Sequence, residues 1–342
     1  TMQIPYDRYE DKIRTVLAAG DPPDIIQIND DYVVDYTKRN LILPLTKYVE
    51  MSDYTRDEMY AAVWDFPWVN GEMMAWNGVN KVRAFVYNVD LFEKAGLPRL
   101  TTKWEDPEWN WDTLLEYAKK LTIVDNNGMT SQYGVSIFHD GGAEQMWTFN
   151  NQGHGLFSAD GKELAAAWPE GIEGLQYLAD LSNKWNVQPR WGSLKQVTAD
   201  NLFLTGKLGM LMTGSWSVPI FRRDADFQWD AAPMPMKKYG RQEGSLVCFG
   251  IPKRAKNPDT SWKLLDFLAS AEAQGVWAKN GFGVPLRPAY GDLYVQPELG
   301  PSNQQVFLDG MNYHQSVHFT EYTQRAKQLF RVQLELIWIG QK

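Results

Sequence analysis

The chain has 342 residues, which is enough for two domains that each bury a core. With 44% hydrophobic and 22% charged residues it has the composition of a globular protein, and a net charge of -8 offers no basic excess for binding a nucleic acid. The sequence has no apolar run near the ~18 residues of a membrane span, and its single cysteine, Cys248, cannot form an internal disulfide. Fifteen tryptophans predict either a large aromatic core or a cleft lined by flat faces for a ring-shaped ligand.

The first elements indicate an α/β unit. Apolar residues recur at helical spacing over 9–19, and Gly20 ends that helix. A short apolar strand follows over 25–28, and a helix that leads directly into such a strand is typical of parallel sheets. Asn29, Asp30 and Asp31 come at the carboxyl end of this strand, where open α/β sheets bind ligands. Their carboxylates and amide suit sugar hydroxyls, although Asp30 or Asp31 could equally cap the helix expected over 32–39.

The segment 69–98 contains a turn, two strands and a helix. Asn70-Gly71 favours positive φ, strands are predicted over 72–76 and 82–87, and Asp90 is a candidate cap for a helix over 91–95. Trp76 and Asn77 end the first of these strands. They are candidate binding residues, with a packed core tryptophan as the alternative for Trp76.

Helices and strands continue to alternate through the rest of the chain. Helices are expected over 111–121 (capped by Asn110), 144–151, 171–185, 199–205, 260–269 and 273–280, and 303–340 is mostly helical. Strands are expected over 133–137, 208–212, 229–235 (an edge strand closed by prolines) and 245–251.

Several candidate binding residues follow these later strands. His139 comes at the end of strand 133–137, and Trp147 lies just beyond it. Trp216 opens a helix after the buried strand 208–212, Trp191 lies in a loop, and Arg287 follows the turn 281–285. The alternatives are a turn histidine, core tryptophans and a surface arginine.

The sequence lacks the common catalytic and cofactor motifs. It contains no P-loop, no dinucleotide fingerprint, no nucleophile elbow and no metal-spaced histidine cluster with Cys248. We therefore expect no cofactor, no metal and no catalytic residue. A carboxylate pair for glycoside hydrolysis stays open as an alternative, because 42 acidic residues give no recognisable frame for or against it.

Six passages together resemble one family. They include AAGDPPDII at 18–26, YNVDLF at 87–92, WDTLL at 111–115 and NGFGVP at 280–285, and the order is kept through 203–216 and 247–253. The chain resembles, over nearly its whole length, the family 1 extracellular solute-binding proteins of ABC importers, the group that includes maltose-binding protein. Each passage alone is weak, but six in register are specific.

This resemblance implies a two-lobed, type II periplasmic-binding-protein-like α/β fold, in which helices flank a mixed sheet in each lobe and ligand binds between them. Lobe 1 would comprise residues 1–88 and 249–288, and lobe 2 residues 89–248 and 289–342. The chain would cross between lobes near 87–90, 248–250 and 286–290. The resemblance also implies that Trp76 and Asn77 lie where the family lines its cleft. It makes Trp216 the strongest candidate for a ligand contact, because family members commonly place a sugar-stacking aromatic there. Family members begin with a strand, a helix and an export signal before the position of Met2, so we expect further residues before Thr1.

The resemblance also implies a function without catalysis. The protein would be the extracytoplasmic, monomeric solute-binding component of an ABC importer and would present its ligand to permease subunits. The aromatic content favours a carbohydrate, and an oligosaccharide over a small ion. A glycoside hydrolase and a carbohydrate-binding surface protein are the alternatives.

Overall fold

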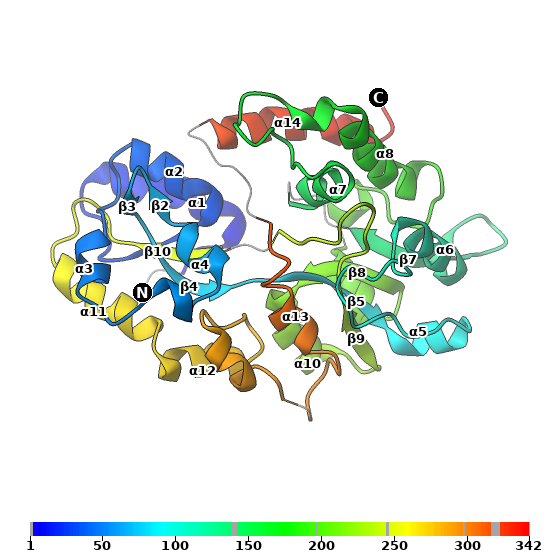
Figure 1. Ribbon diagram of the computed structural model, residues 1–342. Helices are drawn as coiled ribbons and strands as arrows, with labels where there is room; N and C mark the ends of the chain where they lie inside the picture. The colour runs from blue at the N-terminus through cyan, green and yellow to red at the C-terminus, as the bar shows by residue number, and fades with distance from the viewer. Residues whose placement is uncertain are drawn as a thin grey trace.

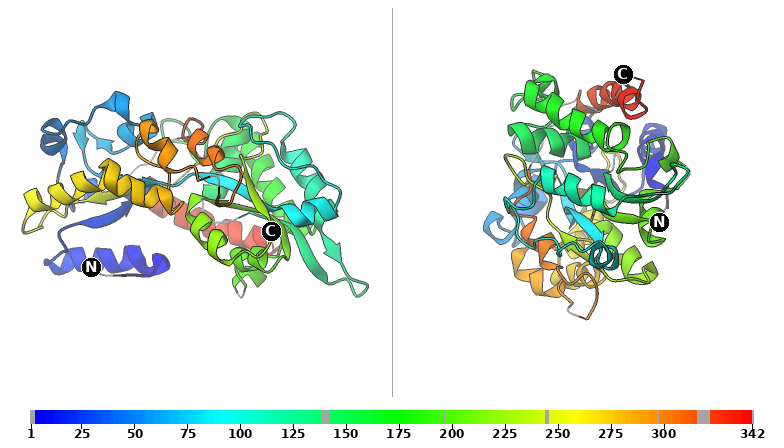
Figure 2. Two further views of the ribbon diagram at one scale, coloured as in Figure 1. Left: turned by 90° about the horizontal axis from the view of Figure 1, so that it is seen from below. Right: turned by 90° about the vertical axis from the view of Figure 1, so that its right-hand side faces the viewer.

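The computed structural model describes residues 3–137, 142–195, 197–243, 246–296, 298–315 and 322–341. Two lobes lie side by side, and each is built on a sheet of its own (Figure 1, Figure 2). We call the lobe with the N-terminal helix lobe 1 and the other lobe 2. The predicted two-lobed α/β architecture is confirmed.

Lobe 1 contains a three-stranded sheet in the order β1 (Ile26–Asn29), β10 (Leu246–Gly250) and β4 (Trp76–Asn80). The central strand β10 runs antiparallel to both neighbours. β1 and β4 therefore run in the same direction but are separated by a strand from a distant part of the chain. The helix-to-strand pattern at the N-terminus predicted a parallel sheet, and this is wrong for the described strands of lobe 1, because both pairings are antiparallel.

Lobe 2 contains a five-stranded mixed sheet. Its order is β6 (Ile123–Val124), β7 (Thr130–Ile137), β8 (Leu208–Gly214), β5 (Arg83–Asn88) and β9 (Trp229–Ala232). β7 and β8 are parallel, and the other pairs are antiparallel. Every residue of β5 and β8 is buried, as expected for continuous apolar strands that helices cover on both faces. β9 lies at the sheet edge, as its prolines predicted.

Local turn and cap signals account for many element boundaries. Asn70 and Gly71 have φ of 54° and 82° and join the hairpin β2 (Trp68–Val69) and β3 (Glu72–Met73). The Asn110 side chain accepts hydrogen bonds from the backbone N–H groups of residues 112 and 113, at 2.9 and 3.0 Å, as a helix cap does. The predicted cap Asp90 is wrong, because the Asn88 side chain accepts from the Leu91 N–H instead, at 3.0 Å.

The described helices have the following bounds: α1 (Tyr6–Ala19), α2 (Asp30–Lys38), α3 (Thr46–Glu50), α4 (Ala61–Asp65), α5 (Val89–Lys94), α6 (Trp111–Leu121), α7 (Gly142–Gln152), α8 (Pro169–Asn183), α9 (Ala199–Leu204), α10 (Val218–Asp224), α11 (Pro258–Leu268), α12 (Ala271–Lys279), α13 (Gln305–Asp309) and α14 (Thr323–Trp338). Short 3-10 helices occupy Arg56–Glu58, Ala165–Ala167, Ser193–Lys195, Ser215–Ser217 and Pro288–Leu293. α1, α2 and α11 belong to lobe 1, and α6, α7 and α8 to lobe 2 (Figure 1).

Strand pairing moves two of the expected crossings between lobes. β5 pairs with β8 and β9 of lobe 2, so the chain leaves lobe 1 at Lys81–Val82 and not near residue 88. β10 pairs with β1 and β4 of lobe 1. The chain has therefore returned from lobe 2 to lobe 1 before Leu246, whereas lobe 1 was expected to resume at residue 249. An alternating pattern predicts a strand but does not say which sheet that strand joins. The remaining lobe boundaries stay predictions.

Candidate functional site

The carboxyl end of β1 brings three of the predicted site residues to the junction of the lobes. Asn29 precedes α2, and Asp30 and Asp31 form its first turn. The Asp30 carboxylate is 8% exposed and accepts hydrogen bonds from the N–H groups of Asp31 (3.0 Å) and Leu246 (3.2 Å). Burial, and the nearby carboxylates of Asp31 and Glu243, raise the pKa of Asp30 well above its usual value. Asp30 thus ties α2 to β10, while Asn29 occupies the cap position without a side-chain cap bond.

Asp31 is bound from the opposite lobe. The Lys327 ammonium of α14 lies 3.1 Å from the Asp31 carboxylate, and the Gln324 side-chain amide donates to the Asp31 carbonyl at 2.9 Å. Burial opposes the charged form of Lys327, but the carboxylates of Asp31, Glu243 and Asp30 outweigh it and raise the pKa of the ammonium. Lys327 therefore carries a positive charge within a group of carboxylates.

A second ion pair lies where the chain enters lobe 2. Arg83 begins β5, is 5% exposed and donates from Nε to the Glu243 carbonyl at 3.2 Å. Its guanidinium also lies 3.6 Å from the Glu243 carboxylate. The Glu243 charge also acts on Asp30. The Arg83–Glu243 pair therefore links β5 of lobe 2 electrostatically to the acidic residues of lobe 1.

Trp216 lies beside this pair. Its ring centroid is 5.3 Å from the Arg83 guanidinium carbon, and the residue is half-buried. Gly214 stands opposite Arg83 in the β5–β8 register. A Cβ on Gly214 would lie 2.2 Å from Cζ3 of Trp216, so the indole rests directly on glycine backbone. Trp216 therefore offers a partly exposed aromatic surface next to charged hydrogen-bonding groups, a combination that is common in small-molecule binding sites.

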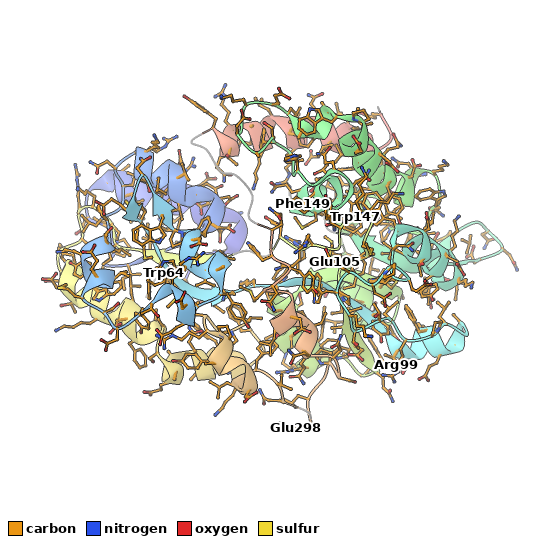
Figure 3. The ribbon with its side chains drawn as sticks, in the orientation of Figure 1. Trp64, Arg99, Glu105, Trp147, Phe149 and Glu298 are labelled. Atoms are coloured by element: carbon orange, nitrogen blue, oxygen red, sulfur yellow. The ribbon has the colours of Figure 1, made fainter. Side chains whose placement is uncertain are left out.

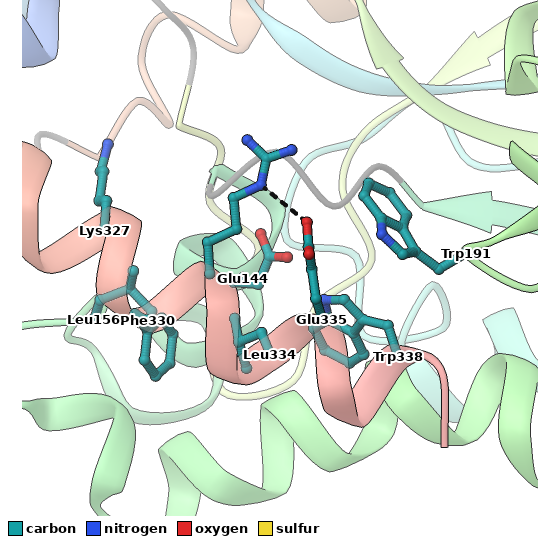
Figure 4. Close-up of a pocket in the computed structure, with 9 residues that line it drawn as sticks. Glu144, Leu156, Trp191, Lys327, Phe330, Leu334, Glu335 and Trp338 are labelled. Carbon is teal, nitrogen blue, oxygen red and sulfur yellow. Dashed lines mark ion pairs between the residues drawn. The ribbon is translucent and has the colours of Figure 1, made fainter. Parts of the chain in front are cut away.

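A small cavity lies beside Lys327 (Figure 4). Its walls are Glu144, Leu156, Trp191, Lys327, Phe330, Arg331, Leu334, Glu335 and Trp338. Lys327 belongs both to this wall and to the ion pair with Asp31, so the cavity opens beside the junction. Its volume is about 20 Å³, which is room for roughly one water molecule. A sugar ring could enter only if α14 or the facing side chains moved.

Two of the predicted tryptophans are packing residues. Trp147 has no exposed surface and lies inside lobe 2, stacked 5.9 Å from Trp111 (Figure 3). Trp76 is 3% exposed and packs between Tyr54 and Trp262 in lobe 1, with ring centroids 5.2 and 5.4 Å away. Other aromatic rings cover both indoles, so neither presents a face to a ligand. Their prediction as ligand contacts is corrected to packing.

The remaining candidates are distributed differently. Trp191 is half-buried and lines the cavity. Arg287 is held within lobe 1, with its guanidinium carbon 4.6 Å above the Tyr54 ring and Nη1 donating to the Tyr290 hydroxyl at 3.2 Å. It is therefore not among the residues gathered at the junction. Asn77 lies in β4 opposite Cys248, and His139 lies outside the described residues.

Sequence reasoning missed Arg83, Glu144, Glu243 and Lys327. An arginine at the start of an otherwise apolar strand is the one signal that could have found Arg83. The partners of Glu243 and Lys327 come from distant parts of the chain, and the residues themselves follow no motif.

Metal and thiol chemistry find no support in the described part of the chain. Those residues contain no group of three or more His, Cys, Asp or Glu that could hold a metal ion. Cys248 is fully buried, and burial raises the pKa of its thiol. Of the helices that the structure describes, none is both long and apolar enough to span a membrane.

Comparison with known proteins gives consistent results. The family model of bacterial extracellular solute-binding proteins matches residues 1–275. The arabinooligosaccharide-binding protein of Bacillus subtilis is 23% identical over 346 residues, a match that covers 98% of this chain and 73% of that protein.

Two solved structures share the fold. The Listeria monocytogenes ABC substrate-binding protein in complex with cycloalternan has a TM-score of 0.90 at 22% identity, with 100% of this chain and 86% of that chain covered. A Thermotoga lettingae ABC transporter solute-binding protein bound with α-D-tagatose has a TM-score of 0.83 at 20% identity, covering 98% and 85%. Because the family model covers most of the sequence, the chain belongs to the bacterial extracellular solute-binding protein family.

Proposed function

We propose that this chain is the solute-binding component of an ABC importer and that it binds a carbohydrate, specifically an oligosaccharide, between its lobes. The observation that carries the proposal is Trp216, which rests on Gly214 with part of its ring exposed beside Arg83. An aromatic face of this kind stacks on the C–H side of a pyranose, and the adjacent Arg83 guanidinium and Glu243 carboxylate bond hydroxyl groups.

The relatives support the choice of a carbohydrate. A Bacillus subtilis relative is named for arabinooligosaccharide, and structures of the same fold contain cycloalternan and tagatose. A Streptococcus pneumoniae relative is a maltooligosaccharide ABC transporter solute-binding lipoprotein. The family is one of extracellular solute-binding proteins. We accordingly infer that this chain works outside the cytoplasm as a monomer, delivers its ligand to permease subunits and catalyses no reaction.

A sugar panel tests this proposal. Thermal unfolding is followed with neutral mono- and oligosaccharides, and the same mixtures are analysed by chromatography for released products. We expect one group of sugars to raise the unfolding temperature without turnover, because a ligand that binds only the native state stabilises it. A panel without any shift would contradict the carbohydrate assignment, and product release over time would favour a glycoside hydrolase.

Substitution of Trp216 locates the site. Trp216→Ala should weaken binding by at least about tenfold, since ~1.4 kcal/mol of lost stacking and burial corresponds to that factor. Trp185→Ala is the matched control, because Trp185 is also half-buried but packs against Tyr177, Lys119 and Lys184 within lobe 2. Equal affinities for both variants would place the ligand elsewhere.

A further inference from the structure

The C-terminal helix α14 is anchored in lobe 2 by its second half. Leu334 and Trp338 are 4% and 2% exposed, and the Asn183 side chain at the end of α8 donates to the Ile337 carbonyl at 2.9 Å. Figure 1 shows α14 lying above α7 at the top of lobe 2, with its C-terminal end next to α8. This half of the helix moves with lobe 2 for as long as these contacts persist.

The first half of α14 contacts lobe 1. Gln324 and Lys327 are three residues apart, which places them on one face of the helix. Gln324 binds the backbone carbonyl of Asp31, and Lys327 binds the carboxylate of the same residue. The side chains of Lys327 and Asp31 are 18% and 20% exposed, so solvent screens this pair only in part. One helix therefore holds both the main chain and the side chain of Asp31 from the opposite lobe.

Lys327 also balances charge at the junction. The charges of Asp31 and Glu243 act on Asp30, and all three carboxylates act on Lys327. Arg83 pairs with Glu243, whereas Lys327 is the cation paired with Asp31 among the described residues. Without the Lys327 charge, the carboxylates of Asp30 and Asp31 in lobe 1 and of Glu243 in the crossing segment would repel one another more strongly. This repulsion disfavours the close approach of the two lobes.

We propose that α14 is a strap that holds the two lobes together, with Lys327 and Gln324 as positioning residues that fix Asp31 at the ligand site. The same helix closes one wall of the 20 Å³ cavity, so release of the strap would also enlarge the space beside Trp191. The strap lowers the free energy of the closed arrangement relative to the open one, and ligand affinity rises with the population of the competent state. The effect on affinity rests on the proposed function, but the effect on lobe separation does not.

The test measures the distance between lobes in the ligand-free protein. Spin labels on Lys12→Cys in α1 and Glu116→Cys in α6 report the separation, because both positions are exposed, while the native Cys248 is buried and unlabelled. Lys327→Met removes the charge and keeps the length of the side chain. We expect the distance distribution to broaden toward longer separations and, for the sugar found in the panel, Kd to rise by roughly fivefold or more.

Two further variants make the result specific. Lys327→Arg keeps the positive charge and should restore the parent distances. Arg325→Met removes an exposed charge from the same helix and should leave both the distances and Kd unchanged. A Lys327→Met distribution identical to that of the parent would overturn the strap. If Lys327→Met shifts the distances between the lobes but the parent protein binds no sugar of the panel, the strap is supported and the carbohydrate assignment is wrong.

Discussion

Gly214→Ala should weaken sugar binding without straining the backbone. Gly214 has φ of -161°, an extended conformation that alanine adopts freely, so the effect must come from the new methyl group. That methyl would lie 2.2, 2.5 and 2.6 Å from three carbons of the Trp216 ring, whereas ordinary contacts are 3.4–4 Å. The indole must therefore move by about 1 Å or more, or tilt away from the strand.

The displaced ring would lose part of its stacking on the sugar. A loss of about 1–2 kcal/mol corresponds to a 5- to 30-fold rise in Kd. Overpacking itself costs about 1–3 kcal/mol of stability, so thermal unfolding must be measured beside the titration. Isothermal titration of the sugar identified in the panel gives Kd directly.

Gly209→Ala is the matched control for this substitution. Gly209 lies in the same strand, and a Cβ there would meet Leu121 Cδ1 at 2.8 Å, away from the junction of the lobes. This variant should lose stability and keep its affinity. If Gly214→Ala binds the sugar within about twofold of the parent, a change too small to reflect lost stacking, the position of Trp216 does not determine affinity and the reasoning fails.

Three other predictions follow from Trp147, Glu10 and Cys248, which are buried or partly buried. Trp147→Ala should lower the free energy of unfolding by about 3–5 kcal/mol in denaturant titration while the folded fraction keeps its affinity, because this ring packs and does not bind; reduced affinity in the folded protein would contradict the packing role. Burial raises the pKa of Glu10 from 4.5 to about 7, although the Tyr36 hydroxyl donates to its carboxylate at 2.7 Å. The folded state therefore binds a proton that the unfolded state releases, so this contribution to stability is present below about pH 4.5 and is lost as pH rises through 7. Glu10→Gln should therefore flatten the dependence of the unfolding free energy on pH between 4.5 and about 7. An unchanged dependence in this variant would mean that other groups cause it. The Cys248 thiol should resist a thiol reagent in the native protein and react in denaturant, whereas rapid native labelling would show that β10 opens readily.

Local signals in the sequence predicted most elements of the fold. Gly20 adopts φ of 87° after α1, Asn110 caps α6, and Asn70-Gly71 turns the hairpin, as the residue types indicated. Each of these features depends on backbone groups only a few residues away. The sheet that a strand joins depends instead on partners far along the chain. β5 pairs with β8, and this is why the first crossing was predicted too late.

The candidate site shows the same division. Asp30 and Asp31 were chosen as candidates because they follow a strand, and Trp216 because it opens a helix after the buried strand 208–212. Both choices rest on positions that the sequence defines, and ligand contact at these residues stays a prediction. Trp147 and Trp216 both follow strands and differ in what covers them. The neighbours of Trp147 come from α6 and α8, which no local pattern reveals. Lys327 and Asp31 are separated by 296 positions, so their contact required the structure.

The most direct test of ligand binding between the lobes is amide hydrogen exchange with and without the sugar identified in the panel. We predict slower exchange on both sides of the junction, at residues 29–31 of lobe 1 and at residues 83, 214–216 and 324–327 of lobe 2. Protection confined to one lobe, or no change in exchange at these segments, would contradict binding between the lobes.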